Sequence, residues 1–254
     1  MLEERLQRIQ QILFAQGMSS VGALAEHTHS SEATIRRDLD RLEGLGLVER
    51  TRGGAKLAQG AGVEVAFQAR EHQEVAFKRA IARAAHAHLR PDTTVLLDAG
   101  TTVLQLARII RLEPMPLTVI TNSLAVSQEL IGVTGINLYI LGGQVRPENL
   151  SSVGFYAEES LRRFWATQLF LGSNAVHLEH GLSSHDPQEA AINRLMLERA
   201  ETRYLLADSS KFDARAMHHV AGLNGIHHVV TDARLESRWQ EALREHGVGL
   251  ELVG

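Results

Sequence analysis

The chain has 254 residues, of which 44% are hydrophobic, and this length predicts one large α/β domain or two domains. No apolar run approaches the roughly 18 residues of a membrane helix. Because it has no cysteine and no signal-peptide region, we expect a cytoplasmic protein without disulfides, thiolate zinc sites or cysteine nucleophiles. The net charge of −4 does not by itself indicate nucleic-acid binding, so any such binding has to come from a local arrangement of charge.

Three short helices are predicted near the N-terminus. Apolar residues recur at helical spacing over residues 2–13, and Gly17 fits the position just after a helix end. Ser20 can cap a second short helix, and Ser31 can cap a third that spans roughly residues 32–44. The third helix carries threonine and arginine on the faces that its apolar residues leave free.

A small hairpin is predicted after these helices, with strands at 47–50 and 55–57 around a glycine turn. Three helices and a basic hairpin are typical of a winged helix-turn-helix, in which the second helix of the pair enters the major groove and its neighbours contact phosphates. The alternative is a small helical cap with a solvated charged face, since residues 1–57 hold eight basic and eight acidic side chains. The candidate DNA-contacting residues are Ser31, Thr34, Arg36, Arg37, Arg41, Arg52 and Lys56.

The rest of the chain alternates between strands and helices. Residues 58–70 have the small and polar composition of a linker, and residues 71–89 predict a helix that joins this linker to the first strand. Apolar strands interleaved with helices predict a largely parallel sheet covered on both faces. The predicted strands are 94–98, 117–121, 136–141, 167–171, 203–207, 227–231 and 249–253, and the helices between them lie near 102–111, 124–131, 155–164, 188–200 and 236–246.

The turn after the first of these strands predicts an anion site. Residues 95–97 form the end of a buried strand, Gly100 lets the backbone approach a ligand closely, and Thr101 or Thr102 can cap the next helix. Free backbone N–H groups and the helix dipole at such a turn favour a phosphate. The alternative is an ordinary strand-to-helix turn with a threonine cap.

Small or hydrogen-bonding residues also follow the other strands. Ligands gather beyond the carboxyl ends of the strands in a parallel sheet, although each of these segments taken singly also suits a turn. Their recurrence at one edge, with one lysine and one arginine, indicates a polyhydroxylated phosphate ester as the ligand. The candidate residues are Asp98, Gly100, Thr101, Thr102, Asn122, Ser123, Gly143, Arg146, Asn174 and Lys211.

Residues 31–39 (Ser-Glu-Ala-Thr-Ile-Arg-Arg-Asp-Leu), followed by Gly53-Gly54-Ala55, resemble the N-terminal signature of the DeoR family of bacterial transcriptional regulators. The resemblance covers nearly the whole chain, and its further landmarks are Asp98-Ala99-Gly100-Thr101-Thr102, Thr121-Asn122-Ser123, Leu141-Gly142-Gly143, Gly181-Leu182 with Glu189, and Asp208-Ser209-Ser210-Lys211-Phe212. It implies an effector domain similar to ribose-phosphate isomerases and glucosamine-phosphate deaminases. It also implies a sugar-phosphate sensor that holds the phosphate on residues 100–102 with help from Asn122, Ser123 and Lys211, and it adds Glu189 to the site.

Two positions depart from the family pattern. Many members have an acidic residue where this chain has Asn174, and many have lysine where it has Asn193. The Asn193-Arg194 pair, with residues 181–187 before it, resembles the branch that regulates N-acetylgalactosamine and related amino-sugar or hexitol operons. These departures leave the identity of the ligand open.

An enzyme is the main alternative, because the implied fold is that of sugar-phosphate isomerases and deaminases. Proton transfer on a sugar requires a positioned base, for which Asp98 or Glu189 could serve. The amide of Asn174 in place of an acid, and a DNA-binding N-terminus, disfavour this alternative. His177, His180 and His185 are the best metal-ligand candidates, but no metal-binding motif occurs, so we expect no metal and no catalytic residues.

We therefore predict an α/β protein with a winged helix-turn-helix DNA-binding domain (1–57), a linker (58–70) and a larger, mostly parallel effector-binding domain (71–254). The expected function is repression of a carbohydrate-catabolism operon, with release from operator DNA by a phosphorylated sugar or amino sugar and no cofactor. We expect a homo-oligomer, a dimer or tetramer, because one winged helix reads too few base pairs to be selective. No membrane partner is expected, and the helix at 71–89 should transmit the signal.

Overall fold

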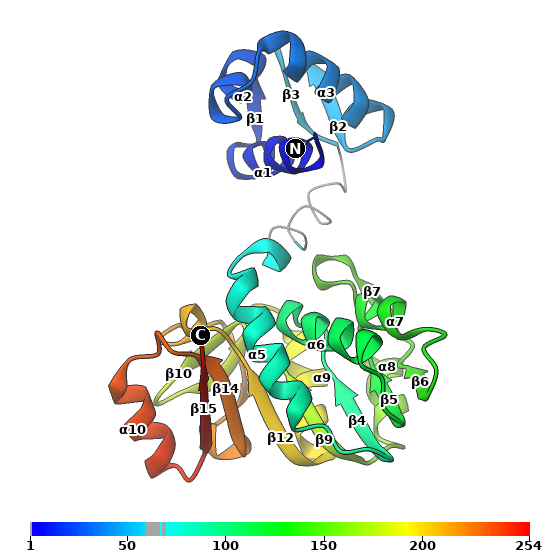
Figure 1. Ribbon diagram of the computed structural model, residues 1–254, viewed down its shortest axis with the longest axis vertical. Coiled ribbons are helices and arrows are strands. Elements are labelled where there is room, and N and C mark those ends of the chain that lie inside the picture. The colour runs from blue at the N-terminus through cyan, green and yellow to red at the C-terminus, as the bar shows by residue number, and fades with distance from the viewer. Residues whose placement is uncertain (1, 59–66, 68–69) are drawn as a thin grey trace. The chain divides into compact units, whose positions relative to one another are not determined.

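The computed structural model describes residues 2–58, 67 and 70–254, which fold into two compact units, Met1–Gln73 and Glu74–Gly254 (Figure 1). The residues predicted as a linker, 58–70, lie for the most part outside the described residues, namely 59–66, 68 and 69. Each unit has its own core and is described by itself.

The first unit consists of three helices and a three-stranded antiparallel sheet. Ser20 and Ser31 accept hydrogen bonds from the backbone N–H groups of Ala23 and Thr34, so both predicted N-caps are confirmed. Gly17, with φ of +75°, follows the first helix as expected. The elements are α1 (Leu2–Gln16), β1 (Met18–Ser20), α2 (Val21–His27), α3 (Glu32–Gly44), β2 (Val48–Thr51) and β3 (Gly54–Leu57), and the strand order is β1-β3-β2. Their shared core contains Ile9, Leu13, Leu24, Ile35, Leu39, Leu42, Val48 and Ala55.

The strand β1 was not predicted, and it explains the second of the two glycines in the hairpin, Gly54. Gly53 has φ of +86°, a conformation that the tight turn between β2 and β3 requires. Gly54 pairs with Ser20 across β1 and β3, and a Cβ at Gly54 would lie 2.1 Å from the carbonyl oxygen of Ser19. Only glycine therefore allows β1 to pair with the hairpin.

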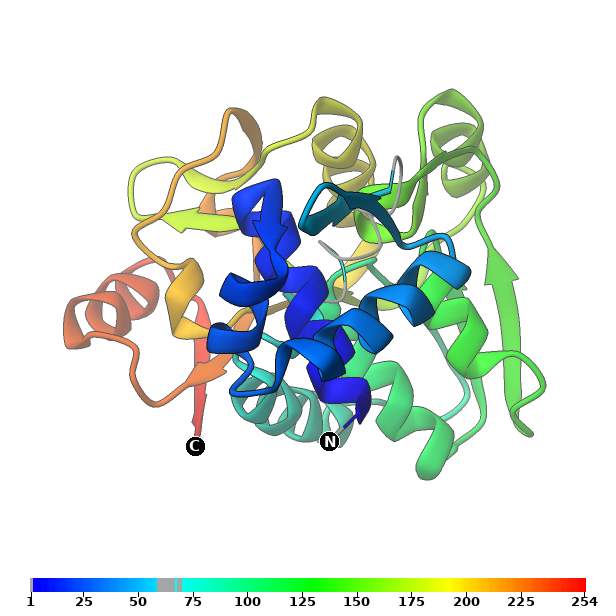
Figure 2. The ribbon, with the colours of Figure 1, turned by 90° about the horizontal axis from the view of Figure 1, so that it is seen from above.

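The second unit contains a seven-stranded parallel sheet, and all seven predicted strands are confirmed within a few residues. The strand order is β15-β14-β12-β9-β4-β5-β6. In Figure 2, α10 and β15 lie at one end of the second unit and the green segment around α7 lies at the other, as the strand order requires. The strands are β4 (Thr93–Leu97), β5 (Leu117–Thr121), β6 (Ile136–Ile140), β9 (Ala166–Leu171), β12 (Ala200–Leu206), β14 (His228–Asp232) and β15 (Gly249–Val253), and the helices are α5 (Val75–Ala87), α6 (Thr101–Leu112), α7 (Leu124–Leu130), α8 (Phe155–Leu161), α9 (Pro187–Glu198) and α10 (Ser237–Glu245).

Helices cover both faces of this sheet, as predicted for strands that are buried on both sides. The helices α5 and α6 pack against each other on one face, and α9 packs against β9 and β12 from the other (Figure 1). The core includes Leu96, Leu169, Leu205 and Trp239, all at most 1% exposed. The predicted fold class, a winged helix-turn-helix followed by a mostly parallel α/β domain, is confirmed.

The helix predicted at residues 71–89 is shorter than expected. Helix α5 begins at Val75 and ends at Ala87, and the residue before it, Glu74, has φ of +53°. A left-handed residue cannot continue a right-handed helix, so the helical run is interrupted at Glu74. The local apolar periodicity contained no sign of this interruption.

Two small antiparallel sheets that the sequence did not predict lie outside the main sheet. One pairs β7 (Gln144–Arg146) with β8 (Ser151–Val153), and the other has the order β10-β11-β13, formed by residues Ala175–His177, Gly181–Ser184 and His218–Ala221. Their strands have only three or four residues, which is too short for a periodic hydrophobic pattern. Short 3₁₀ turns accompany them: η1 (Pro147–Asn149), η2 (Ser209–Lys211) and η3 (Leu223–Gly225).

Candidate functional site

The strand order reverses between β4 and β9, which is the position at which a ligand crevice is expected in an open parallel sheet. From β4 the chain proceeds outward through β5 and β6 and then returns to the other side of β4 to form β9. In an open parallel sheet, the ligand site lies beyond the carboxyl ends of the strands at such a reversal. The residues that follow β4 and β9 are therefore the centre of the candidate sensor site.

Backbone from these two strand ends meets closely at Gly100 and Gly172. A Cβ at Gly100 would lie 3.3 Å from the Cα of Gly172, so a larger residue would push the two segments apart. The N–H of Gly172 donates to Asp98 Oδ2 at 3.1 Å. The predicted residues Asp98, Gly100 and Asn174 thus come from two adjoining strand ends.

Asp98 is a buried carboxyl group, 4% exposed. Burial and, second, the negative charge of Glu189 raise the pKa of Asp98 to about 7, while the N–H groups of Ala99, Gly172 and Gly100 act in the opposite direction. A carboxyl group with this pKa can exist in either protonation state near neutral pH. Carboxyl groups with such perturbed pKa values are concentrated at functional sites.

Helix α6 begins at this crevice with a glycine cap. The expectation that Thr101 or Thr102 caps the helix is wrong: Gly100 is the N-cap residue, and Thr101 and Thr102 are the first helical residues. The intrahelical bonds begin with Leu104, whose N–H donates to the carbonyl of Gly100. The N–H groups of residues 101–103 consequently have no carbonyl partner within the helix, and glycine has no side chain that could cover them.

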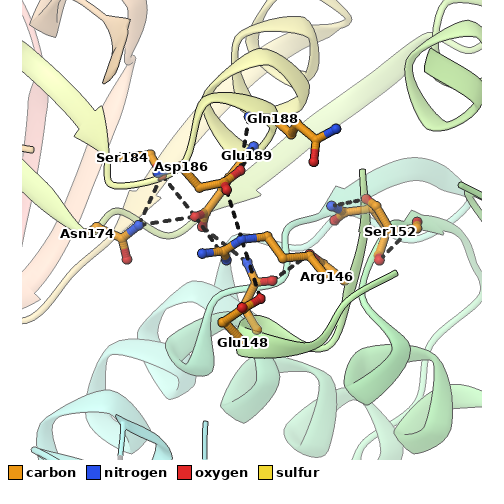
Figure 3. A network of polar contacts seen from close by, with 11 residues as sticks. Arg146, Glu148, Ser152, Asn174, Ser184, Asp186, Gln188 and Glu189 are labelled. Atoms are coloured by element: carbon orange, nitrogen blue, oxygen red, sulfur yellow. Dashed lines mark hydrogen bonds and ion pairs between the residues drawn. The ribbon is translucent and has the colours of Figure 1, made fainter. Parts of the chain in front are cut away.

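A network of polar contacts lies beside the crevice and has Glu189 at its centre (Figure 3). Arg146 contacts Glu189 Oε2 through Nη1 at 3.5 Å and Asp186 Oδ2 through Nε at 3.3 Å. Ser184 Oγ donates to Glu189 Oε2 at 2.9 Å, and Asn174 Nδ2 donates to the same oxygen at 3.4 Å. Three predicted residues, Arg146, Asn174 and Glu189, are therefore brought together, with Arg146 engaged by carboxylates.

Three further members of this network were missed as site residues: Asn149, Ser184 and Asp186. Asn149 is 4% exposed, and its Nδ2 donates to Glu189 Oε1 at 3.2 Å. Asp186 is the N-cap of α9 and accepts from the N–H groups of Gln188 and Glu189, both at 2.9 Å. The pair Asp186-Pro187 is the sequence signal of this cap, because proline is favoured at the first helical position. The strand β11, which carries Ser184, and the turn η1, which carries Asn149, had no such signal.

The predicted residues after β5 and β6 make structural contacts. Asn122 Nδ2 donates to the carbonyl of Ser152 at 3.1 Å, while Asn122 Oδ1 is buried without a hydrogen-bond partner among the described residues. Ser123 Oγ caps α7 by accepting from the N–H of Val126 at 3.1 Å. A Cβ at Gly143 would lie 2.7 Å from the carbonyl oxygen of Val153. These contacts hold the strand ends in place, and of the three residues only Asn122 has a side-chain acceptor left over within the described part of the chain.

Lys211 differs from Arg146 in its partners. It is half-buried at the end of η2, and none of the ion pairs among the described residues involves it. The next residue, Phe212, is 8% exposed and meets Trp239 edge to face, with 4.9 Å between ring centroids. The turn is therefore anchored as the sequence predicted, and it presents a cation that no carboxylate among these residues neutralises.

The predicted DNA-contacting residues lie on α3 and on the β2–β3 hairpin. Arg36 pairs with Glu32 one turn earlier, with 2.7 Å between Nη2 and Oε2, and Lys56 pairs with Glu49 across the hairpin at 2.7 Å. Within the part of the chain that the structure describes, Arg37, Arg41 and Arg52 are exposed and appear in no ion pair. As far as the structure describes them, the predicted DNA-contacting cations thus divide into two that are paired, Arg36 and Lys56, and three that are not.

Helix α3 is held in place by two ion pairs. Arg5 of α1 donates to Asp38, which is 4% exposed, with 2.5 Å between Nε and Oδ2. Arg50 of β2 donates to Asp40 Oδ1 at 2.8 Å. Asp38 is therefore buried against α1, whereas Asp40 pairs with Arg50 at the surface, and Arg36 and Arg37 also lie on the exposed part of the helix. Within the described residues, no helix is both long and apolar enough to cross a bilayer.

Two family models match the chain. The model described as DeoR-like helix-turn-helix domain matches residues 5–60, and the model described as DeoR C terminal sensor domain matches residues 73–233. These matches extend over both compact units.

Curated relatives are similar over almost the whole chain. One, from Escherichia coli O157:H7 and named for a proposed role as aga operon transcriptional repressor, is 35% identical over 99% of this chain and 94% of its own length. Another, the L-fucose operon activator of Haemophilus influenzae, is 30% identical over 92% of this chain and 93% of its own. Among solved structures, ribose 5 phosphate isomerase A from Neisseria gonorrhoeae aligns with a TM-score of 0.38 and 12% identity, covering 54% of this chain and 53% of that one.

Proposed function

The chain belongs to the DeoR family of transcriptional regulators, and from this premise we propose that it represses a carbohydrate-catabolism operon and leaves its operator when a phosphorylated sugar or amino sugar binds. The observation that carries the proposal is the glycine-capped start of α6 at the reversal point of the sheet. Both relatives described above are named for operons, and one of them is named for a sugar.

The start of α6 suits the phosphate of such a ligand. Its first three N–H groups, which have no carbonyl partner within the helix, and the positive end of the helix dipole favour a dianion. Lys211 supplies a further positive charge from the end of β12, two strands away from β4 in the sheet. Arg146 is less suited to binding the phosphate, because Asp186 and Glu189 already pair with its guanidinium.

The sugar would meet mostly acceptors. Asp98, Glu189 and Asn174 offer carboxyl and amide oxygens, which accept hydrogen bonds from hydroxyl groups and from an ammonium group. An amino sugar phosphate carries one cationic and one anionic group, and the crevice has a carboxyl side and a helix N-terminus to match them. This complementarity favours an amino sugar within the class of sugar phosphates.

Operator binding belongs to the first unit. We assign base and phosphate contacts to α3 and the hairpin, with Arg37, Arg41 and Arg52 as the cations that no carboxylate among the described residues holds. A homo-oligomer, a dimer or tetramer, would place two such units on the half-sites of one operator. Release follows if the sugar phosphate binds more tightly to a conformation that misplaces the DNA-binding units.

A panel of ligands tests the proposal. The melting temperature of the full-length protein is measured with glucosamine 6-phosphate, galactosamine 6-phosphate, ribose 5-phosphate, inorganic phosphate and the unphosphorylated amino sugars. A phosphorylated amino sugar should raise the melting temperature most, and the same compound should dissociate the protein from DNA taken upstream of its own gene, followed by fluorescence anisotropy. Equal shifts from phosphorylated and unphosphorylated sugars would contradict the phosphate site.

A sugar-phosphate isomerase or deaminase is the second candidate, because the raised pKa of Asp98 is what a general base near neutral pH requires. The same panel is assayed for isomerisation and for ammonia release. Turnover that Asp98→Asn abolishes would replace sensing by catalysis as the role of this crevice.

A further inference from the structure

The guanidinium of Arg234 connects the loop after β14 to the residue that precedes α5. Its Nε donates to Asp232 Oδ1 at 2.7 Å, and its Nη2 donates to Glu74 Oε2 at 2.8 Å. The same group lies over the ring of Phe77, with 3.7 Å between Cζ and the ring centroid. One side chain therefore contacts the carboxyl edge of the sheet and the start of the second compact unit.

Asp232 joins Arg234 to the turn that carries Lys211. It is fully buried at the end of β14, and it accepts from both the N–H and the hydroxyl of Ser209, at 2.7 and 2.9 Å. Burial raises the pKa of Asp232, but the hydrogen bonds from Arg234 and Ser209 outweigh it and hold the pKa below its usual range. Asp232 Oδ1 accepts hydrogen bonds from Ser209 and from Arg234 at once. A displacement of Ser209 would therefore alter the hydrogen bond between Asp232 and Arg234.

Glu74 occupies a conformation that needs support. Its φ of +53° is unfavourable for an L-residue with a side chain of this size and persists where surrounding contacts fix it. The ion pair with Arg234 is such a contact. Glu74 is also the first residue of the second unit, where the chain arrives from the DNA-binding unit.

The pocket beside these residues leaves them room to move. Ser209, Ser210 and Arg234 line a cavity of about 270 Å³ together with Leu235, Glu236 and Trp239. The side chain of Arg234 is 46% exposed, whereas that of Asp232 is fully buried. Asp232 is thus the enclosed member of this set of contacts, whereas the Ser209 turn and Arg234 border the cavity.

We infer that Arg234 is a positioning residue that couples the Ser209–Lys211 turn to the backbone conformation at Glu74. A ligand that draws Lys211 toward it would move Ser209, alter the shared oxygen of Asp232 and so loosen or tighten the ion pair of Arg234 with Glu74. The inference rests on the proposed function only in giving Lys211 a ligand; the coupling itself is a property of the free protein. A merely structural ion pair would stabilise Glu74 without responding to Ser209.

Amide hydrogen exchange of the full-length, ligand-free protein tests the coupling. The exchange rate of the segment 74–80 is measured by mass spectrometry in the wild type and in Ser209→Ala, each with and without Arg234→Gln. Ser209→Ala should change the exchange rate of this segment about threefold or more when Arg234 is present and should leave it unchanged when Arg234 is replaced. Arg238→Gln is the matched control, because Arg238 pairs with Glu236 and Asp213 and not with Asp232 or Glu74.

Arg234→Lys is a second variant for the same experiment, to be used if Arg234→Gln does not fold stably. Lysine keeps the positive charge, but its single ammonium group cannot reproduce the fork that spans Asp232 and Glu74, so the response to Ser209→Ala should again be lost. An equal response with and without Arg234, or no response in the wild type, would overturn the inference. Because no sugar phosphate or DNA is used, this outcome is independent of whether the proposed function is correct.

Discussion

Asp98 and Glu189 are two carboxyl groups of one crevice with different surroundings. Glu189 accepts hydrogen bonds from Ser184, Asn149 and Asn174 and lies beside Arg146, so its charge is well compensated. Among the residues that the structure describes, Asp98 accepts hydrogen bonds from backbone N–H groups alone, and the pKa of Asp98 is raised to about 7 by burial and by the charge of Glu189. The protonation state of Asp98 should therefore change with pH in the neutral range.

Stability should fall as the pH rises through the range in which Asp98 titrates. The unfolded chain releases this proton near 3.8, the ordinary pKa of an aspartate, and the folded protein releases it near 7, so the folded state binds more protons between these values, and the free energy of unfolding decreases with rising pH. Asp98→Asn should remove this decrease and stabilise the protein at pH 8 by roughly 2–4 kcal/mol relative to the wild type. Urea unfolding at pH 5 and pH 8 measures it, with the exposed Asp92→Asn as control. The same pH dependence in wild type and Asp98→Asn would show that Asp98 is not its source.

Lys211 is a half-buried cation in the turn that follows β12. Lys211→Ala should weaken sugar-phosphate binding by roughly 1.5–3 kcal/mol, the scale of a charge-assisted hydrogen bond, and leave operator affinity without ligand nearly unchanged. Lys211→Arg keeps the charge and should retain most of the affinity. Isothermal titration with the most stabilising compound of the panel decides this, and an unaltered dissociation constant for Lys211→Ala would place the lysine outside the site.

At the scale of elements, two features depend on glycine for different reasons. Gly54 permits β1 to approach β3, and Gly100 leaves the start of α6 free of a side-chain cap. The first allows β1 to pair with the hairpin, and the second leaves the helix start open for the anion that we propose.

Gly54→Ala should destabilise the first unit by roughly 2–4 kcal/mol, because its Cβ would overlap the backbone of Ser19. Gly44→Ala is the matched control: Gly44 ends α3, a Cβ there meets nothing within 4 Å, and alanine should be neutral or slightly stabilising. Thermal unfolding of both variants, followed by circular dichroism, gives the comparison. Similar melting temperatures for the two would contradict the requirement for close approach.

A negative charge at the start of α6 should compete with the phosphate. Thr101 is half-buried and is the first helical residue, whereas Thr102 is only 6% exposed, so Thr101 accommodates an acidic side chain at lower cost. Thr101→Asp suits the helix dipole and should fold, but it should lose the response to sugar phosphate, while Thr101→Ala should keep most of it. Operator-release titrations compare the three proteins. An equal response from all of them would make this turn an ordinary helix start.

At the scale of the whole molecule, the two compact units have separate cores and separate candidate sites. The DNA-contacting candidates belong to α3 and the hairpin, and the sensor candidates belong to the carboxyl edge of the parallel sheet. Function in a regulator depends on a coupling free energy between two such sites.

The two activities should be separable by mutation. Arg36→Ala with Arg37→Ala should abolish operator binding at physiological salt and leave the thermal shift by sugar phosphate unchanged, because these arginines belong to the first compact unit and the sensor candidates belong to the second. Arg8→Ala, an exposed arginine on α1, is the control and should retain operator binding. Full operator affinity in the double variant would refute the assignment of α3 as the recognition helix.

Local signals in the sequence were sufficient for most of the regular elements. The caps at Ser20 and Ser31, the extent of α3 and the seven parallel strands follow from interactions between residues a few positions apart, namely capping hydrogen bonds and hydrophobic periodicity. The candidate crevice could also be located, because parallel strands place their carboxyl ends at one edge. The DeoR resemblance, carried by short contiguous segments, is confirmed by both family models.

The tertiary structure alone decided which residues meet. Strand β1 is defined by its pairing with β3, in which Ser19 lies opposite Ala55, and Arg146 contacts Glu189, which is 43 positions away in the chain. Glu74, where the helical run is interrupted, pairs with Arg234, 160 positions away, and neither feature could follow from the periodicity of the helix around it. Such contacts are set by packing of elements distant in sequence, whereas propensity and periodicity report only on neighbours. The sequence by itself thus determined the family, the two folds and the edge at which we propose that a ligand binds, and the folded chain determined the partners of each charge at that edge.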